Sequence, residues 1–485
     1  MIPAAKSHTQ EVAVSHPTAA SPRDKVGAVR TELKQQPGLP FLDLLCRALV
    51  EDRCRQLNHP WRRRTYTPWV TLGLFLSQVL SDDHSCDEAV DRFQKLRYDQ
   101  GLPAVSTEST SSCDARQRLP ERLAWDLVRH TGRSIHEQAD EAWTFHGRAV
   151  KIIDGSTVSM PDTPENQSEY PQQTTQSPGV GFPIARLLVV FSLAVGAVLE
   201  AVVGPYQGKQ TSELALLREV IDQFRRGDIA LADRFFCSYW VIAALQARGV
   251  DVVVRLHQCR TADFRRGRRL GREDHLVTWP KPAQRPDWMS RAEYEAMPER
   301  LVVRELRVRV ADKTKRVRSL VIVTTMLDAK AYRAKAVGDL YRQRWHAELD
   351  LRSLKSEMEM EVLRTKSPEM VRKEVAMHLL AYNLIRGIMA EAGRSGGVKP
   401  RRLSFTGATH TVRCFEEVYL YDPVRIRADL PHLLELVVKK RVGDRPDRYE
   451  PRAVKRRPKP HPLLRMPRKE AKRLIARGQI PYSKA

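Results

Sequence analysis

Two aspartates follow short apolar segments of the chain and could together bind a metal ion. Asp154 comes directly after Val150–Ile153, and Asp233 comes directly after Ile229–Ala232. A single aspartate at the end of an apolar segment is usually a turn former. Two carboxylates at adjacent strands repel each other unless a cation lies between them, and such a pair is a common construction for a divalent-metal site. The two aspartates therefore predict a metal site, with two turn-forming residues as the alternative.

A third acid lies in the polar segment Tyr341–Lys355. At about 100° per residue, four side chains of this segment fall on one narrow face of a helix: Tyr341, Arg344, Glu348 and Lys355. An acid flanked by two cations and a tyrosine suits a face that ligates a metal and holds the phosphates around it. The alternative is a solvated helix face joined by charge pairs at three- and four-residue spacing. The two upstream aspartates favour the metal site.

The elements that would position these acids begin near Ala149. Five short runs rich in Val, Ile and Leu have the length and composition of buried strands: Val150–Ile153, Arg186–Ala194, Val198–Val203, Asp228–Ala232 and Val250–Val254. Between them, Glu213–Phe224 and Tyr239–Ala247 have helical spacing. This alternation predicts an α/β fold with a mixed sheet.

The following segment, residues 258–326, is polar and basic and interrupts the α/β pattern. Its two β runs, Leu301–Val310 and Arg316–Thr325, predict a β-rich insertion. Long helices are expected after it, over Ala329–Glu361 and Glu369–Met389. The third acid would therefore lie on a long helix that follows the insertion.

Before the α/β unit, the chain has the pattern of a small helical domain. Four segments carry apolar residues at three- and four-residue spacing: Phe41–Leu49, Val70–Leu80, Asp87–Leu96 and Leu119–His136. The hydroxyl-rich segment 105–119 can cap a helix that presents Arg116 and Arg118 to a phosphate backbone. This segment predicts a DNA-reading helix, with an ordinary capped surface helix as the alternative.

The charge of this 485-residue chain points to a polyanionic partner. Its formal charge is +24, and residues 437–485 hold 17 Lys and Arg against four acids. Such a tail attracts phosphates without regard to sequence, so nucleic acid is the first candidate partner. An anionic membrane is a weaker candidate, because the prolines of the tail prevent a continuous amphipathic helix. A tail that only keeps the chain in solution is the remaining alternative.

Several classes of protein find no support in the sequence. The seven cysteines are scattered and never form a CxxC pair, which fits a reducing compartment and argues against a disulfide framework or a structural zinc site. The first 36 residues contain no signal-peptide pattern, and the longest apolar stretch, Leu187–Leu199, is too short to span a bilayer. Nucleotide-binding, zinc-protease and hydrolase-elbow motifs are absent. We therefore expect a cytoplasmic protein whose chemistry depends on its acids.

Taken together, the acidic motifs resemble a known family of enzymes. The matching residues are Asp154 in Asp-Gly-Ser-Thr, Asp233 in Ala-Asp-Arg-Phe-Phe, and Tyr341, Arg344, Glu348 and Lys355 at Y-x2-R-x3-E-x6-K spacing. They are similar to those of the DDE transposases of bacterial insertion sequences, in the insertion-sequence-four family with its Tyr-Arg-Glu-Lys signature. The similarity extends from about Ser106 to about Met389 and includes segments 160–166 and 207–213. Phe235 stands where the family often has glycine, which we expect to alter the loop rather than the chemistry.

The resemblance implies a ribonuclease-H-like catalytic core in which Asp154, Asp233 and Glu348 hold two divalent ions, Mg²⁺ or alternatively Mn²⁺. The ions would activate a water or a 3′-hydroxyl and stabilise the leaving oxygen during in-line displacement at phosphorus. The family cleaves the ends of its element and transfers the 3′ ends into target DNA. The side chains implied to bind DNA are Tyr341, Arg344 and Lys355, with Arg234, Trp345 and Arg352 as weaker candidates.

A second-strand route through a DNA hairpin would need an aromatic platform for a flipped base. Trp279 or Trp288 in the insertion could supply it, although aromatic residues in such an insertion more often form its core. The family also implies double-stranded DNA as partner, at the element ends and at the target, and a homodimer on paired ends. No membrane is involved, and the expected location is the bacterial cytoplasm, in association with the nucleoid.

We expect six regions along the chain. They are a flexible tail (1–36), a helical DNA-binding domain (37–145), the first part of the catalytic core (146–257), the β-rich insertion (258–326), the second part of the core with the Tyr-Arg-Glu-Lys helix (327–395), and a C-terminal region with the basic tail (396–485). Two other functions stay open from the sequence. One is a catalytically inactive, transposase-derived DNA-binding protein, and the other is a metal-dependent DNA nuclease without joining activity.

Overall fold

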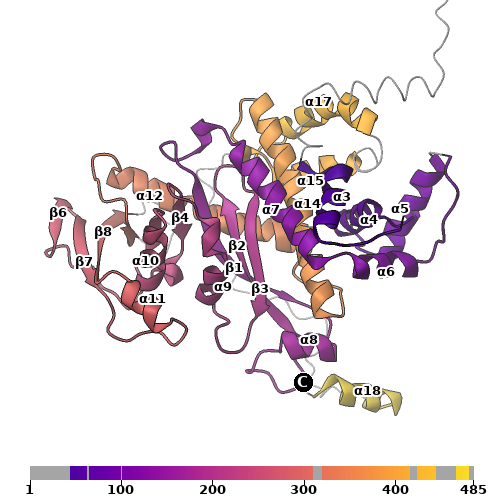
Figure 1. Ribbon diagram of the computed structural model, residues 1–485, viewed down its shortest axis with the longest axis horizontal. Helices are drawn as coiled ribbons and strands as arrows, with labels where there is room; N and C mark the ends of the chain where they lie inside the picture. The colour runs from indigo at the N-terminus through magenta and orange to yellow at the C-terminus, as the bar shows by residue number, and fades with distance from the viewer. Residues whose placement is uncertain are drawn as a thin grey trace, which may run out of the picture. The chain divides into compact units, whose positions relative to one another are not determined.

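A nine-stranded mixed sheet runs through the part of the chain that the computed structural model describes (Figure 1). The described residues are 44–62, 65–99, 101–309, 319–415, 423–443 and 466–479. In sheet order, the strands are β3 (Val198–Pro205), β2 (Ile184–Ser192), β1 (Val150–Ser159), β4 (Ile229–Ala232), β5 (Asp251–Arg255), β9 (Ser319–Thr324), β8 (Arg300–Arg309), β7 (Asp274–Pro280) and β6 (Arg268–Gly271). The predicted α/β fold with a mixed sheet is confirmed.

The first five strands combine two kinds of pairing. β1, β2 and β3 pair antiparallel, whereas β1, β4 and β5 pair parallel. Residues 187–191 of β2 are buried on both faces, which explains why this strand is continuously apolar rather than alternating. The helices α9 (Glu213–Val220) and α10 (Tyr239–Ala247) share one apolar cluster with the sheet, which includes Ile153 of β1. This packing holds the acid-bearing strands rigidly from the side of α9 and α10.

The β-rich segment after β5 continues the same sheet. β9 pairs with β5, and β8 pairs with β9, so β6, β7 and β8 extend the edge of the core. A short helix, α11 (Arg291–Ala296), begins with a capping box formed by Ser290 and Glu293. The predicted strands are confirmed, but the segment does not form a sheet of its own.

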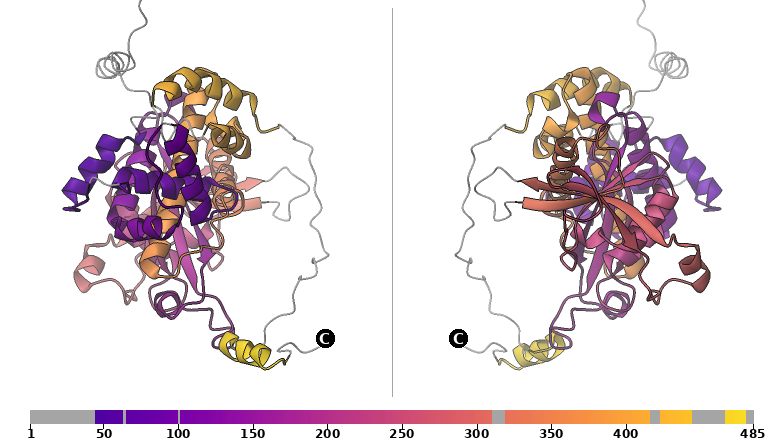
Figure 2. Two further views of the ribbon diagram at one scale, coloured as in Figure 1. Left: turned by 90° about the vertical axis from the view of Figure 1, so that its right-hand side faces the viewer. Right: turned by 90° about the vertical axis from the view of Figure 1, so that its left-hand side faces the viewer.

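Three of the four helices predicted before the core are present, whereas the helix predicted over Phe41–Leu49 begins only at Arg47, and residues 41–43 lie outside the described part of the chain. The helices of this region are α3 (Arg47–Gln56), α4 (Pro68–Leu80), α5 (Cys86–Asp99), α6 (Thr110–Arg118) and α7 (Glu121–Glu137). α7 lies beside the long helix α14 (Pro368–Ser395) and packs against β3 (Figures 1 and 2). At the contact with β3, a Cβ on Gly132 would lie 1.8 Å from the carbonyl oxygen of Val198, so only glycine fits there. α7 therefore packs directly on the sheet of the α/β core.

The single helix predicted over Ala329–Glu361 is wrong, because the segment is not one continuous helix. The structure divides it into α12 (Ala334–Arg342), α13 (Trp345–Arg352) and a π-helical turn (Ser353–Glu357). The turn is closed by a hydrogen bond from the N–H of Met358 to the carbonyl of Ser353. After it, the chain pairs with the end of β1, where the N–H of Ser159 donates to the carbonyl of Glu361. The breaks thus redirect the chain from the helix back to the sheet.

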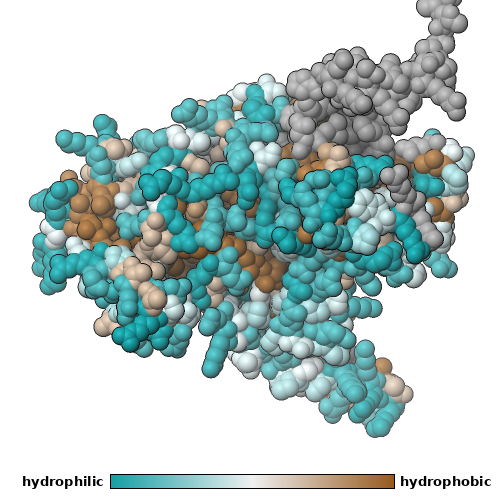
Figure 3. Space-filling view, viewed as in Figure 1, coloured by the Kyte–Doolittle hydropathy of each residue, from teal (hydrophilic) through white to brown (hydrophobic). Residues whose placement is uncertain are grey.

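The remaining helices follow α14. They are α15 (Phe405–Cys414), α17 (Pro423–Lys439) and α18 (Arg468–Ala476). The N-terminal region 1–36 and much of the basic tail lie outside the described residues. Hydrophilic side chains cover most of the face seen in Figure 3. No helix within the described ranges is long and apolar enough to cross a membrane.

Candidate active site

Asp154 and Asp233 lie at the same level of two adjacent strands. β1 and β4 are parallel, and their register pairs Ile152 with Leu231, two residues before each aspartate. The strand pairing therefore agrees with the prediction that the two acids lie on adjacent strands of one sheet. β1 does not end at Asp154, because it continues to Ser159 through pairing with β2. The turn-forming alternative for Asp154 is therefore wrong.

Asp233 lies in the turn that follows β4. One of its carboxylate oxygens accepts a hydrogen bond of 2.7 Å from the N–H of Phe235 and caps a short 3-10 helix (Arg234–Phe236). The Phe235 side chain is exposed. Asp233 therefore has the turn-forming role of the alternative interpretation, and its second oxygen is not engaged by this cap.

The surroundings of Asp154 disfavour its ionised form. Burial raises the pKa of its carboxyl group to about 6, and its side chain is only 16% exposed. The nearby negative charges of Asp233 and Glu213 raise the pKa further, whereas the Arg344 guanidinium lowers it. Crowded carboxylates of this kind need a cation to be ionised together.

Arg344 supplies a cation in this structure. It lies at the junction of α12 and α13, where its Nη2 is 2.5 Å from Oε1 of Glu348 and its Nη1 is 3.7 Å from Oδ2 of Asp154. Tyr341 lies buried beside Arg344, and burial raises the pKa of its hydroxyl to about 12. The break between the two helices thus brings Arg344 between the acid of β1 and the acid of α13.

The three predicted acids have the chemistry of a magnesium site. Asp154, Asp233 and Glu348 offer only carboxylate oxygens, the ligand type that Mg²⁺ prefers. Within the described ranges, no three acidic, histidine or cysteine side chains surround one point closely enough to hold a metal ion. Arg344 lies between two of the acids and balances their charge. The donor set fits a divalent ion, and Arg344 takes the electrostatic role of such an ion here.

A fourth acid, Glu213, was not singled out as a site residue from the sequence. It begins α9 after the N-cap Ser212, and its carboxylate is 3.3 Å from Nη1 of Arg186. A Cβ on Gly155 would lie 2.3 Å from the Glu213 carboxyl carbon, so the glycine after Asp154 makes room for it. The signal was present in the segment 207–213, which takes part in the family resemblance.

A buried acid on α13, Asp350, was also missed. Its side chain is fully buried and lies 2.7 and 2.8 Å from Nη1 of Arg401, and it also pairs with Arg386 of α14. Arg401 in turn donates to the carbonyl oxygens of Ser192 and Leu193 at the end of β2. These bonds fasten α13, which carries Glu348, to the sheet. The signal for this residue in the sequence was an acidic side chain placed between two leucines of the predicted helix.

The side chains predicted to bind DNA separate into two groups. Tyr341 and Arg344 point inward, toward the acids. Lys355, in the π-helical turn, pairs with Glu361 at 3.3 Å and so leaves the single helix face on which it was predicted. The exposed members are Arg234, Trp345 and Arg352, and the Trp345 side chain is 57% exposed.

Two further sequence hypotheses are corrected by the packing. Trp279 is buried, donates to Oε1 of Glu305 at 3.1 Å and stacks under Arg260, so it belongs to the core of the insertion and offers no platform for a base. Arg116 is buried against the ring of Phe75 and donates to the sulfur of Cys86, so it does not face a phosphate backbone.

The remaining residues of these hypotheses stay accessible. Trp288 is half-buried, with the guanidinium of Arg218 over its ring at 4.0 Å. Arg118 is exposed at the end of α6. The cap predicted for this helix does not form, because the N-cap Ser109 makes no side-chain hydrogen bond to it.

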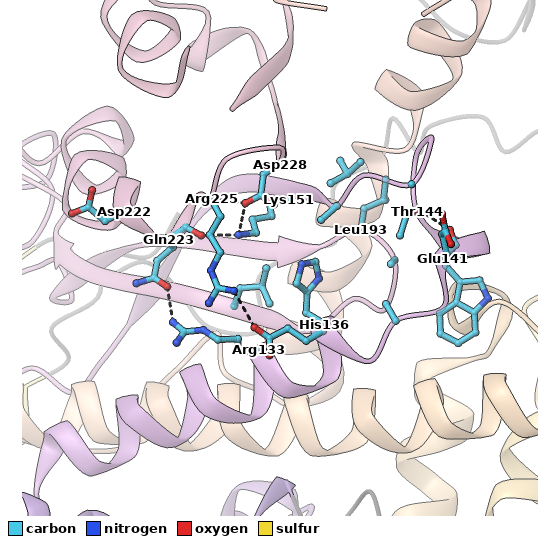
Figure 4. A pocket seen from close by; sticks show the side chains of 18 residues that line it. Arg133, His136, Glu141, Thr144, Lys151, Leu193, Asp222, Gln223, Arg225 and Asp228 are labelled. Atoms are coloured by element: carbon cyan, nitrogen blue, oxygen red, sulfur yellow. Dashed lines mark hydrogen bonds and ion pairs between the residues drawn. The ribbon is translucent and has the colours of Figure 1, made fainter. Parts of the chain in front are cut away.

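A separate cavity of about 470 Å³ lies at the other end of β1 (Figure 4). Its buried Lys151 pairs with Asp228 at 2.6 Å and donates to the carbonyl of Gln223, and His136 lies nearby in the wall. The Lys151 ammonium is therefore engaged by two protein groups. We assign this cavity a structural role and place the chemistry at the acids.

Several known proteins are similar to this chain. Residues 145–384 match the family model described as "Transposase DDE domain". The chain is 29% identical over 357 residues to the transposase InsG for insertion sequence element IS4 of Escherichia coli K12, which covers 72% of this chain and 76% of that protein. It is 39% identical over 69 residues to the transposase for insertion sequence element IS421 of Escherichia coli, covering 14% of this chain and 19% of the relative.

One solved structure is also similar, the piggyBac transposase synaptic complex with hairpin DNA. It aligns with a TM-score of 0.43 and 12% identity over 85% of this chain and 86% of that chain. The matched family segment contains Asp154, Asp233 and Glu348. Residues 145–384 therefore form the DDE domain of a transposase, and the chain is similar over most of its length to a transposase of the IS4 type, an enzyme that cleaves and transfers DNA.

Proposed function

We propose that this transposase cleaves the ends of its insertion sequence and joins the 3′ ends to target DNA at the site formed by Asp154, Asp233 and Glu348. The proposal rests on one observation, which is that β1, β4 and α13 bring their acidic side chains close to one place. The β1–β4 register sets two acids side by side, and Arg344 connects Glu348 to Asp154. The first five strands, in the order β3-β2-β1-β4-β5, support the ribonuclease-H-like core that the resemblance implies.

The acids would bind two divalent ions, as DDE transposases generally do. When bound, such ions lower the pKa of an attacking water or 3′-hydroxyl and stabilise the leaving oxygen. The carboxylates hold the ions, and Asp350 keeps the helix of Glu348 in place through Arg401 and Arg386. With the acids occupied in this way, the Arg344 guanidinium would be available to bind a phosphate group.

DNA would contact the exposed side chains around this site. Arg234 and Arg352 suit phosphates, and the exposed ring of Trp345 suits a base. Tyr341 and Lys355 would hold the DNA end nearer to the acids. The helical region would read the element ends and the basic tail would add attraction independent of sequence, in a homodimer on paired ends in the bacterial nucleoid.

The experiment that tests this function is cleavage and strand transfer on DNA that carries the element's own ends, with Mg²⁺. Glu348→Gln removes one charge from the site, and Glu295→Gln is a matched control at an exposed position on α11. We expect joining to fall by at least about a thousandfold in Glu348→Gln, with end binding retained, and to be unchanged in the control.

Other outcomes would favour the other functions. Equal joining by both variants would remove Glu348 from the site. Binding without cleavage by the wild type would favour an inactive DNA-binding relative, and Mg²⁺-dependent cleavage without joining would favour a nuclease.

A further inference from the structure

The helical region contains a groove of about 1020 Å³ that the proposed chemistry does not use. One wall is the segment after α3, with His59, Trp61, Arg62 and Tyr66. The other wall is the helix α6, and Arg118 lies on it. The groove therefore brings together cationic and aromatic side chains from two parts of the chain.

The exposed face of α6 forms one wall of the groove. Ser111, Asp114 and Arg118 are spaced three and four residues apart, so they lie on one side of the helix, and all three are exposed. The opposite side, with Ser112 and Arg116, is buried. α6 is thus held by one face and presents a polar face to the groove.

The groove is electropositive. Its lining holds two guanidinium groups, Arg62 and Arg118, against the single acid Asp114, and His59 is present as a neutral imidazole near pH 7. The pKa of His59 is lowered by partial burial and by the positive charges of Lys373 and Arg118. Arg62 is exposed, so its charge is available to a ligand. These features favour an anionic occupant.

Aromatic groups give the groove a second property. The ring of Trp61 is half-buried in the wall, with part of its surface open to the groove. The ring of Tyr66 packs beside Phe93, with 6.3 Å between the ring centroids. Its hydroxyl is shielded from solvent and has no hydrogen-bond partner among the described residues. A ligand with a flat apolar group would therefore fit against the open part of the Trp61 ring.

We propose that this groove binds one strand of the DNA at the element end, with phosphates on Arg62 and Arg118 and a base or sugar against Trp61. The combination of cations with an open aromatic ring is the one that proteins use to hold a nucleic acid strand. Asp114 and Ser111, on the same face of α6, can accept or donate hydrogen bonds to base edges. This inference rests on the proposed function and names the surface through which the helical region takes part in it.

The test is the affinity of the full-length protein for a fluorescent duplex of the element end, measured by anisotropy with EDTA over a range of salt concentrations. Arg118→Gln is expected to weaken binding and to lower the slope of log K against log salt by about one. Trp61→Leu is expected to weaken binding roughly five- to 150-fold, because it removes the ring but keeps an apolar side chain.

Arg122→Gln is the matched control. Arg122 is exposed on α7, four residues beyond Arg118, and lies outside the groove. Its loss is expected to change the affinity by less than about twofold. Thermal unfolding of each variant identifies any loss of affinity that comes from a loss of fold.

Three results would overturn the inference. The first is wild-type affinity in both Arg118→Gln and Trp61→Leu. The second is equal weakening by Arg122→Gln, which would indicate general charge attraction. The third result concerns polyglutamate as a competitor. If polyglutamate displaces the duplex from the wild type, and the Trp61→Leu variant binds polyglutamate more weakly, the groove would be assigned to an acidic protein segment. None of these three results contradicts joining that depends on Glu348, so the proposed function would stand. A wild type that binds no end duplex would contradict the proposed function itself.

Discussion

At the scale of single residues, the electrostatics of the site are set by how closely the acids approach each other. Gly155 allows the Glu213 carboxylate to lie against β1, next to Asp154. Arg344 compensates part of the resulting negative charge from the other side. The types of the three main acids could be predicted from the sequence, because each follows an apolar strand or lies in the four-residue signature. The contributions of Glu213 and Arg344 could not, because they depend on distances between segments far apart in the chain.

The raised pKa of Asp154 predicts a pH-dependent stability of the metal-free protein. A carboxyl group with a pKa of about 6 in the folded protein and an ordinary value near 3.8 when unfolded favours the folded state when it is protonated, and this stabilisation is lost as the pH rises through about 6. Asp154→Asn cannot ionise. In EDTA, the variant should therefore gain more stability over the wild type at pH 8 than at pH 5, by about 1 kcal/mol.

Urea unfolding at the two pH values measures this difference. Added Mg²⁺ should stabilise the wild type at pH 8 and have little effect on Asp154→Asn. A stability difference that is the same at both pH values would contradict the raised pKa.

At the scale of elements, β1 and the signature helices carry the acids, and their true lengths were the least predictable feature. The strands were predicted from their apolar runs, but β1 continues five residues beyond Asp154 because β2 supplies hydrogen bonds along its whole length. The periodicity of residues 334–357 is helical throughout, yet the helix breaks where Arg344 meets Glu348 and where the chain turns back to Ser159. Both departures come from tertiary contacts, which local periodicity does not contain.

The buried pairing of Asp350 predicts that the position of α13 is costly to disturb. Asp350→Ala leaves Arg386 and Arg401 without their carboxylate, and should lower the free energy of unfolding by about 3–5 kcal/mol. Asp339→Ala, on α12, breaks only a surface pair with Arg342 and should cost less than about 1 kcal/mol. Denaturant unfolding of the two variants is the measurement, and equal losses would show that Asp350 does not anchor the helix.

At the scale of the whole molecule, the positive charge agrees with the DNA partner proposed for the catalytic fold. The prediction of a nucleic-acid partner came from the charge of +24 and its concentration near the C-terminus. Within the tail, α18 forms despite the surrounding prolines, and Arg468 pairs with Asp162 at 2.8 Å and lies over the ring of Phe182. Composition could predict the charge of this segment but not its contact with the loop after β1.

Removal of residues 444–485 tests the contribution of the tail. This segment holds 14 Lys and Arg against four acids, so its loss should weaken binding to any duplex by at least about tenfold at low salt and reduce the salt dependence of binding. Mg²⁺-dependent cleavage at saturating protein should persist, because the acids remain. Unchanged affinity and salt dependence, measured by anisotropy, would assign the tail a role in solubility alone.

The most direct test of the metal-binding role of the acids is a change of ligand at Asp154. Asp154→Cys places a thiolate where Mg²⁺ requires an oxygen, whereas Mn²⁺ accepts the softer ligand more readily. We predict that Asp154→Cys cleaves element-end DNA at least about a hundredfold more slowly than the wild type with Mg²⁺ and recovers at least about tenfold with Mn²⁺, with thermal unfolding at a temperature no lower than that of the wild type. Wild-type cleavage by the variant with Mg²⁺, or the same loss with both ions in a folded variant, would contradict a metal ligand at Asp154.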